Sequence, residues 1–303
     1  MIGLKGLTGV ILAALGMTAS TAPLSVVTTT TDLAAIAREI GGKRVTVKSM
    51  AVGTQDPHFV EAKPSLILDL RKADVYAQVG LGLEVGWAPL LLDQSRNANI
   101  RPGGKGHLDM SAAATVLDIP PGKVTRAEGD IHPYGNPHYW LGPENGKRMA
   151  NLFTERFSAL DSDGAVEYAN NLRAFHAKVD RAIAEWRQLL APVQNAKVIA
   201  YHNSWKYFVS FAGLEIAGYI EPKPGIPPSP SYLAQLIADM KRDRVKVIIV
   251  DPFYDVKVPQ FVAERAGAKV LVLPSSVGGV KGVDDYVSLI DYNIRALRKA
   301  LGE

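Results

Sequence analysis

Residues 165–190, AVEYANNLRAFHAKVDRAIAEWRQLL, carry large apolar side chains at intervals of three or four positions. This spacing gathers the apolar side chains on one helix face, so the stretch is predicted to form a single amphipathic helix. Pro192 ends the pattern, because proline disrupts a helix interior. The predicted helix is longer than most helices of globular proteins, and we interpret it as a rigid strut between two parts of the chain.

Strand-like and helical segments alternate on both sides of the strut. Short apolar runs predict strands at 24–30, 45–50, 75–79, 197–200, 215–220, 245–250 and 269–273. Periodic segments predict helices at 32–40, 64–72, 84–95, 144–160, 205–211, 231–242, 259–266 and 284–301. Between 97 and 134, the frequent glycine, proline and aspartate residues indicate a mostly irregular segment.

Alternation of this kind is typical of parallel sheets covered by helices. The predicted fold class is therefore α/β, with two lobes, each a mostly parallel sheet flanked by helices, joined by one long rigid helix. We expect the N-terminal lobe to span 23–164, the linking helix 165–192 and the C-terminal lobe 193–303.

Composition narrows the possible partners. The chain has 303 residues, of which 47% are hydrophobic and 21% charged, as expected of a two-domain globular protein with a sizeable core. The net charge is only +4 and the sequence has no dense basic run, which argues against a nucleic-acid partner. The absence of cysteine excludes disulfides and thiolate metal sites, so a metal would have to bind nitrogen and oxygen ligands.

The first 22 residues have the features of a secretory signal peptide. Lys5 supplies positive charge, residues 7–17 are apolar, and Ser20-Thr21-Ala22 resembles a cleavage site. The apolar run is too short for an ordinary membrane span, and a buried N-terminal helix is the alternative. With no cysteine available for lipid attachment, we expect a mature protein that starts near Pro23 and is free in a periplasm-like compartment.

Three histidines stand out as candidate metal ligands. They are His58 in QDPHF, His138 in GNPHYW and His202 in AYHNSW. Imidazole is the commonest protein ligand for borderline-soft divalent metals. A single histidine beside aromatic residues is more often structural, but His58 and His202 each follow a predicted strand, one in each lobe, and Asp251 is placed similarly. Because ligands bind beyond the carboxyl ends of parallel strands, these residues indicate a metal site between the lobes.

Common catalytic motifs are absent from the sequence. The chain contains no HExxH, GxGxxG, P-loop or GxSxG pattern. The histidines therefore have no evident catalytic companion.

Several segments together carry a resemblance to a known family. They are 26–30, 41–42, 56–65 (DPHFVEAKPS), 73–74, 136–141 (NPHYWL), the long helix, 201–205 (YHNSW) and 228–230. In order and spacing the chain resembles the zinc- and manganese-type solute-binding proteins of ABC transporters. The resemblance implies one metal ion between two α/β lobes, with His58, His138 and His202 as ligands. It also implies delivery of the ion to a membrane permease, and we expect a monomer without enzymatic activity.

The fourth ligand position departs from the family pattern. Relatives usually carry an aspartate just after the final strand, whereas this chain reads LPSSVGG at 273–279. Asp251, at the end of the preceding predicted strand, is the nearest substitute, either as a ligand or as a partner of an imidazole. Water or Glu221 could also fill the position. His132 is either an accessory capture site or a surface loop histidine, and the role of His107 stays open.

Three imidazoles favour zinc over manganese, because manganese prefers harder oxygen ligands, although copper and nickel also bind such sites. We therefore predict a periplasmic protein that captures zinc for an ABC permease. Two alternatives remain: a three-histidine zinc hydrolase with Asp251 or Glu221 as its base, and an adhesin built on the same fold.

Overall fold

The computed structural model describes residues 22–122, 132–223 and 225–302, so residues 1–21 of the predicted signal peptide lie outside the described residues. The strands are β1 (Leu24–Thr28), β2 (Val45–Ser49), β3 (Val75–Gln78), β4 (His107–Asp109), β5 (Lys197–Ala200), β6 (Glu215–Tyr219), β7 (Val247–Val250) and β8 (Lys269–Val272). The α-helices are α1 (Thr31–Gly41), α2 (Pro64–Lys72), α3 (Ala88–Ser95), α4 (Pro143–Leu160), α5 (Ala165–Leu190), α6 (Lys206–Phe211), α7 (Pro230–Asp243), α8 (Lys257–Ala266) and α9 (Tyr286–Gly302).

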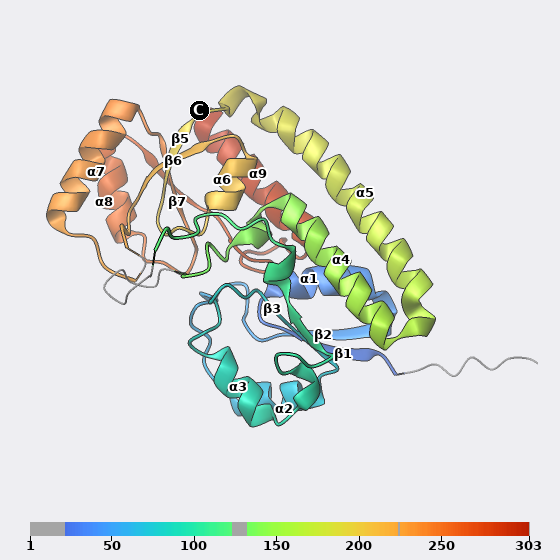
Figure 1. The fold of residues 1–303 in the computed structure, drawn as a ribbon. Coiled ribbons are helices and arrows are strands. Elements are labelled where there is room, and N and C mark those ends of the chain that lie inside the picture. The colour runs from blue at the N-terminus through green and yellow to red at the C-terminus, as the bar shows by residue number, and fades with distance from the viewer. Residues whose placement is uncertain (1–21, 123–131, 224, 303) are drawn as a thin grey trace, which may run out of the picture.

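The strands form two four-stranded sheets, one in each lobe (Figure 1). The order is β2-β1-β3-β4 in the first sheet and β6-β5-β7-β8 in the second, and all pairings are parallel. Helices flank both sheets. The predicted fold class, two parallel-sheet lobes joined by a long helix, is therefore confirmed.

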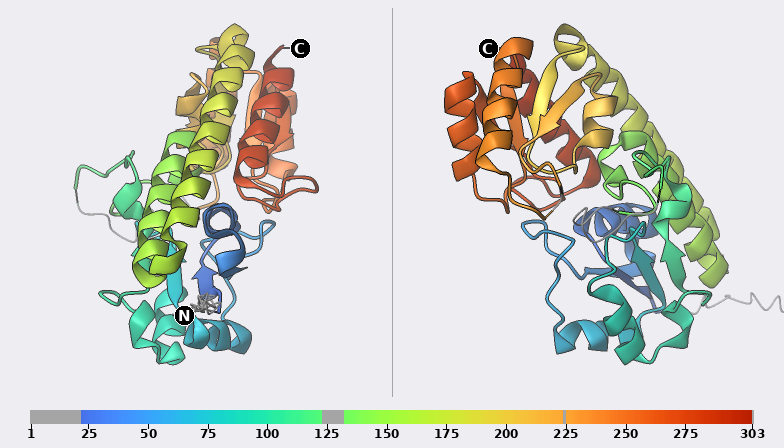
Figure 2. Two further views of the ribbon diagram at one scale, coloured as in Figure 1. Left: turned by 90° about the vertical axis from the view of Figure 1, so that its right-hand side faces the viewer. Right: turned by 60° about the vertical axis from the view of Figure 1, so that its left-hand side comes forward.

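Helix α5 packs against α1 and α4 of the N-terminal lobe and against α9 of the C-terminal lobe. Figure 2 shows it running along the side of the molecule past both lobes. With 26 residues it is about 39 Å long at 1.5 Å per residue. Its apolar face, including Phe175 and Val179, is buried in a core cluster that also contains Val26 of β1 and Val198 of β5. One continuous core thus crosses the boundary between the lobes and restricts their relative movement.

Two local features differ from the sequence-based expectation. The segment 97–134 contains β4, a three-residue strand whose His107 pairs with Tyr76 of β3. Helix α3 begins at Ala88 rather than at 84, because the Glu84 carboxylate accepts hydrogen bonds from the amides of Val79 and Gly80 and so holds a turn there.

The loops after the strands bring the two lobes together. The loop after β2 carries His58 and the loop after β5 carries His202, and the two imidazole rings lie 5.4 Å apart. At the start of α1, the Asp32 carboxylate accepts a hydrogen bond from the amide of Val277 in the C-terminal lobe, at 2.9 Å. Over the residues described, no helix has the length and apolar character needed to cross a membrane.

Candidate metal centre

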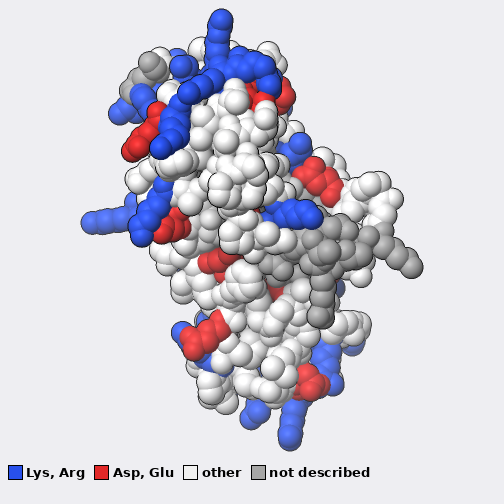
Figure 3. All heavy atoms as spheres, turned by 90° about the vertical axis from the view of Figure 1, so that its left-hand side faces the viewer, with Lys and Arg blue, Asp and Glu red and all other residues white. Residues whose placement is uncertain are grey.

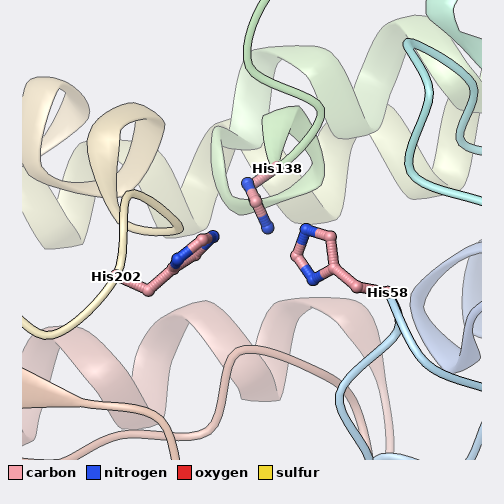
Figure 4. Close-up of side chains that lie close together, drawn as sticks. All are labelled: His58, His138 and His202. Atoms are coloured by element: carbon pink, nitrogen blue, oxygen red, sulfur yellow. The ribbon is translucent and has the colours of Figure 1, made fainter. Parts of the chain in front are cut away.

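The side chains of His58, His138 and His202 converge between the lobes (Figure 4). One nitrogen from each ring lies within 4.8 Å of the others. The ring centroids are 5.1 Å apart for His58 and His138, and 5.6 Å apart for His138 and His202. Among the residues that the structure describes, these three form the one group of histidine and acidic side chains close enough to share a cation.

Two of the imidazoles are oriented by the same local device. The Asp56 Oδ1 atom lies 2.9 Å from the backbone nitrogen of His58 and 2.7 Å from its Nδ1. Asn136 Oδ1 does the same for His138, at 3.0 Å and 2.9 Å. In each case the residue two positions before the histidine accepts from the Nδ1–H group. With the proton on Nδ1, each neutral ring carries its lone pair on Nε2, the nitrogen through which it can bind an ion.

The third imidazole has a carboxylate partner from the adjacent strand end. Glu221, just after β6, places its Oε2 atom 3.0 Å from Nδ1 of His202. Both side chains are largely buried. The sequence leaves Glu221 open as a fourth ligand; in the structure its carboxylate contacts Nδ1 of His202 and does not belong to the three-histidine group.

Indole and phenol groups fix the loops that carry the histidines. Trp87 Nε1 donates to the carbonyl of Pro57 at 3.1 Å, and Trp140 Nε1 donates to the carbonyl of Ser275 at 2.8 Å. The hydroxyl of Tyr207 donates to the carbonyl of Asn136 at 2.8 Å. Such contacts reduce the conformational freedom lost when an ion binds.

Burial favours the neutral, ligating form of the central histidine. His138 is 3% exposed, and burial lowers its pKa well below the usual value, assisted by positive charge on the neighbouring imidazoles. Burial acts to raise the pKa of Asp56, but the hydrogen bond and charge of His58 outweigh it and lower the pKa overall. An ionised Asp56 beside His58 offsets the charge of a bound cation.

Asp251 directly follows β7, as predicted from the sequence, and is fully buried, but it is not a member of the three-histidine group. Its Oδ2 atom accepts hydrogen bonds from Trp205 Nε1 at 3.1 Å and from Ser204 Oγ at 3.4 Å. Its Oδ1 atom has no hydrogen-bond partner among the described residues, and burial raises the pKa of the carboxyl. Asp251 therefore contacts Ser204 and Trp205, which follow His202 in the sequence.

His132, which the sequence left undecided between a capture site and a surface residue, lies against the three-histidine group. Its ring stacks on His58, with centroids 5.2 Å apart and 25° between the planes. Burial, and then the charges of His58 and His202, lower its pKa to about 3. A cavity of about 180 Å³ opens beside the imidazoles, and His132, His138, His202 and Glu221 are among its lining residues.

Sequence reasoning missed the partners of the imidazoles and the position of His132. The repeated pattern of Asp or Asn two positions before a histidine, in DPH and NPH, was the available signal for Asp56 and Asn136. His107, by contrast, lies in β4 and contacts Tyr76, with ring centroids 5.9 Å apart.

Comparison with known proteins identifies the family. A model of the zinc-uptake complex component A family, periplasmic (ZnuA), matches residues 26–300. The chain therefore belongs to this family of metal solute-binding proteins of ABC transporters, and the resemblance inferred from the sequence is confirmed. Since the family and its curated relatives are substrate-binding proteins, the chain is not an enzyme.

Individual relatives are distant but cover nearly the whole chain. The manganese ABC transporter substrate-binding lipoprotein PsaA of Streptococcus pneumoniae is 24% identical over 286 residues, covering 92% of this chain and 89% of PsaA. The metal ABC transporter substrate-binding lipoprotein FimA of Streptococcus parasanguinis is also 24% identical, covering 92% of this chain and 90% of FimA.

Solved structures share the fold over a similar extent. A zinc-bound deletion mutant of ZnuA is 27% identical, with a TM-score of 0.75, covering 92% of this chain and 98% of the other. A manganese-bound periplasmic metal-binding protein from Candidatus Liberibacter asiaticus has a TM-score of 0.75 at 19% identity, covering 91% of this chain and 98% of the other.

Proposed function

We propose that the protein binds one zinc ion in the periplasm, through His58, His138 and His202, and delivers it to an ABC permease for uptake. The observation that carries this proposal is the convergence of three imidazoles from loops of both lobes, with one nitrogen of each within 4.8 Å of the others. Each ring has its Nδ1 atom beside an acceptor, which leaves Nε2 for the ion. The permease and ATPase components of such a transporter are the expected partners.

The donor set supports zinc over manganese. Nitrogen ligands suit zinc, whereas manganese prefers carboxylate oxygens. In this site Asp56 and Glu221 lie within 3.0 Å of the Nδ1 atoms and do not belong to the converging group. The PsaA relatives are named for manganese and the family model for zinc, so the support for zinc comes from these side chains.

The size of the cavity gives the hydrolase alternative no support. A volume of about 180 Å³ is well below the ~300–1,000 Å³ typical of pockets for organic ligands. It suffices for an ion and a few waters at ~30 Å³ each. The family model and the PsaA relatives are named for metal uptake and transport and give no support to the adhesin alternative.

The surface near the boundary between the two lobes is compatible with entry of a cation. Figure 3 shows one face, on which Lys and Arg gather at both ends, most densely at the end formed by the C-terminal lobe, while the described middle of the face is mostly uncharged with some Asp and Glu. A divalent cation that approaches the middle of this face thus meets little concentrated positive charge.

The test is metal binding by the purified protein and two alanine variants. We expect zinc competition titration to show that His138→Ala weakens binding at least about tenfold, because one ligand is lost. His176→Ala is the matched control, since His176 lies on α5 and its Nε2 atom contacts the carbonyl of Lys147. Zinc affinity that is equal in His138→Ala and the unmodified protein would refute the site, and tighter manganese than zinc binding would refute the choice of metal.

A further inference from the structure

Zinc in a closed site usually has four ligands, and the three-histidine group supplies three. Three carboxylates lie near the site, and none of them belongs to the three-histidine group. Asp56 and Glu221 contact Nδ1 atoms. Asp251 accepts through Oδ2 from Trp205 and Ser204, and its Oδ1 atom, unpaired among the described residues, does not belong to the three-histidine group. The stretch after β8, where the family usually has an aspartate, holds Ser275, whose carbonyl accepts from Trp140. The fourth donor is therefore to be sought elsewhere around the cavity.

His132 offers a nitrogen that already points at the group. Its Nε2 atom lies 3.1 Å from Nε2 of His58. In a tetrahedral zinc site with Zn–N bonds of 2.0–2.1 Å, neighbouring ligand nitrogens are separated by ~3.3 Å. The distance between the two imidazoles thus matches one edge of a zinc tetrahedron. His132 also lines the same cavity as His138 and His202.

The tautomers follow from the partners of His58. Since Nδ1 of His58 lies 2.7 Å from the Asp56 carboxylate, a neutral His58 carries its proton on Nδ1 and has a lone pair on Nε2. The 3.1 Å contact then requires His132 to donate its Nε2–H to that lone pair. In the metal-free protein the Nε2–H hydrogen of His132 thus lies between the Nε2 atoms of His132 and His58, the two atoms that a shared cation would bind. Zinc can replace it once the His132 proton is on Nδ1.

We propose that His132 is the fourth zinc ligand, so that the bound ion is held by four imidazoles. This inference rests on the proposed zinc-binding function. His132 is not yet as close as the other three: its ring centroid lies 6.1 Å from that of His138, compared with 5.6 Å between His138 and His202. Binding must therefore draw His132 inward along the stack with His58. A nitrogen donor here replaces the family's usual carboxylate oxygen and increases the preference for zinc over manganese.

Zinc K-edge X-ray absorption tests the coordination directly. The protein, loaded with one equivalent of zinc, is expected to show four imidazoles, and His132→Ala is expected to show three with an oxygen ligand. The control His176→Ala keeps four. In competition titration, His132→Ala is expected to weaken zinc binding about tenfold or more, as for loss of a ligand or its partner.

A carboxylate at the same position gives a second measurement. His132→Asp is expected to show three imidazoles and one oxygen, and to raise manganese affinity relative to zinc affinity. A purely structural His132 would not change that ratio. Three imidazoles in the unmodified protein, or an unchanged imidazole count in His132→Ala, would overturn the four-imidazole site while leaving zinc capture in place. If His138→Ala does not weaken zinc binding, both the proposed function and the four-imidazole site are overturned.

Discussion

The partner of His202 provides the sharpest test of how the site is oriented. Glu221 Oε2 lies 3.0 Å from Nδ1 of His202, and the two side chains are 10% and 6% exposed. A hydrogen bond to a charged group in such a setting contributes about 1.5–3 kcal/mol. Loss of a partner that orients a metal ligand typically costs 10–100-fold in metal affinity, or about 1.4–2.8 kcal/mol. The two magnitudes agree, so we expect Glu221→Ala to raise the zinc Kd about 10–100-fold.

Glu221→Gln separates charge from geometry. Its amide oxygen can still accept from Nδ1–H, so we expect a smaller loss, at most about tenfold. The matched controls are Glu215→Ala and Glu215→Gln, because Glu215 is exposed at the opposite end of β6. Competition titration with a zinc chelator measures all four variants, and metal-free melting temperatures check the fold. A Kd for Glu221→Ala within twofold of the unmodified protein would refute an orienting role. A loss as large as that of His202→Ala would identify Glu221 as a ligand itself.

Two further predictions concern stability. Burial raises the pKa of Asp32 to about 7, so the folded state holds more protons than the unfolded state between about pH 4 and 7, and stability falls as the pH rises through this window. Asn at position 32 cannot ionise and keeps an acceptor for the amide of Val277. We therefore expect Asp32→Asn to raise the free energy of urea unfolding at pH 8 by an amount on the order of 2–4 kcal/mol, and this gain should disappear near pH 4. An equal gain at both pH values would contradict this prediction. The buried Tyr286 hydroxyl donates to the carbonyl of Trp140 at 2.7 Å, so Tyr286→Phe should cost about 1–3 kcal/mol in urea unfolding, and a change below about 0.5 kcal/mol would count against that bond.

Elements with strong local signals were predicted well from the sequence. The bounds of α2 and α5 match the prediction, because Pro64 stands in the first turn of α2 and the apolar spacing of α5 runs without interruption until shortly before Pro192. Elements with weak local signals were not predicted. β4 has only three residues, and its pairing with β3 depends on a neighbour some 30 positions away, which periodicity does not reveal.

In the site, too, features with a local sequence pattern could be predicted, and contacts between residues far apart in the sequence could not. His58, His138 and His202 could be selected because two of them share the X-Pro-His pattern and two of them follow strand ends. The contact between His58 and His132 joins residues 74 positions apart, so no sequence spacing predicts it. The placement of Glu221 on Nδ1 depends on the parallel pairing of β5 with β6, which brings the ends of both strands to one edge of the sheet.

The geometry also bears on how the ion is captured and released. The converging nitrogens lie within 4.8 Å of one another, whereas a zinc tetrahedron has edges of ~3.3 Å, so in the proposed zinc site each pair would approach by at most about 1.5 Å. The lobes share a continuous core along α5, which opposes a wide hinge movement. Loop displacements of this size do not require the lobes to separate. Capture and release are therefore best explained by small shifts of the loops that carry His58 and His202, which can change the ligand distances while α5 and the two sheets keep their packing.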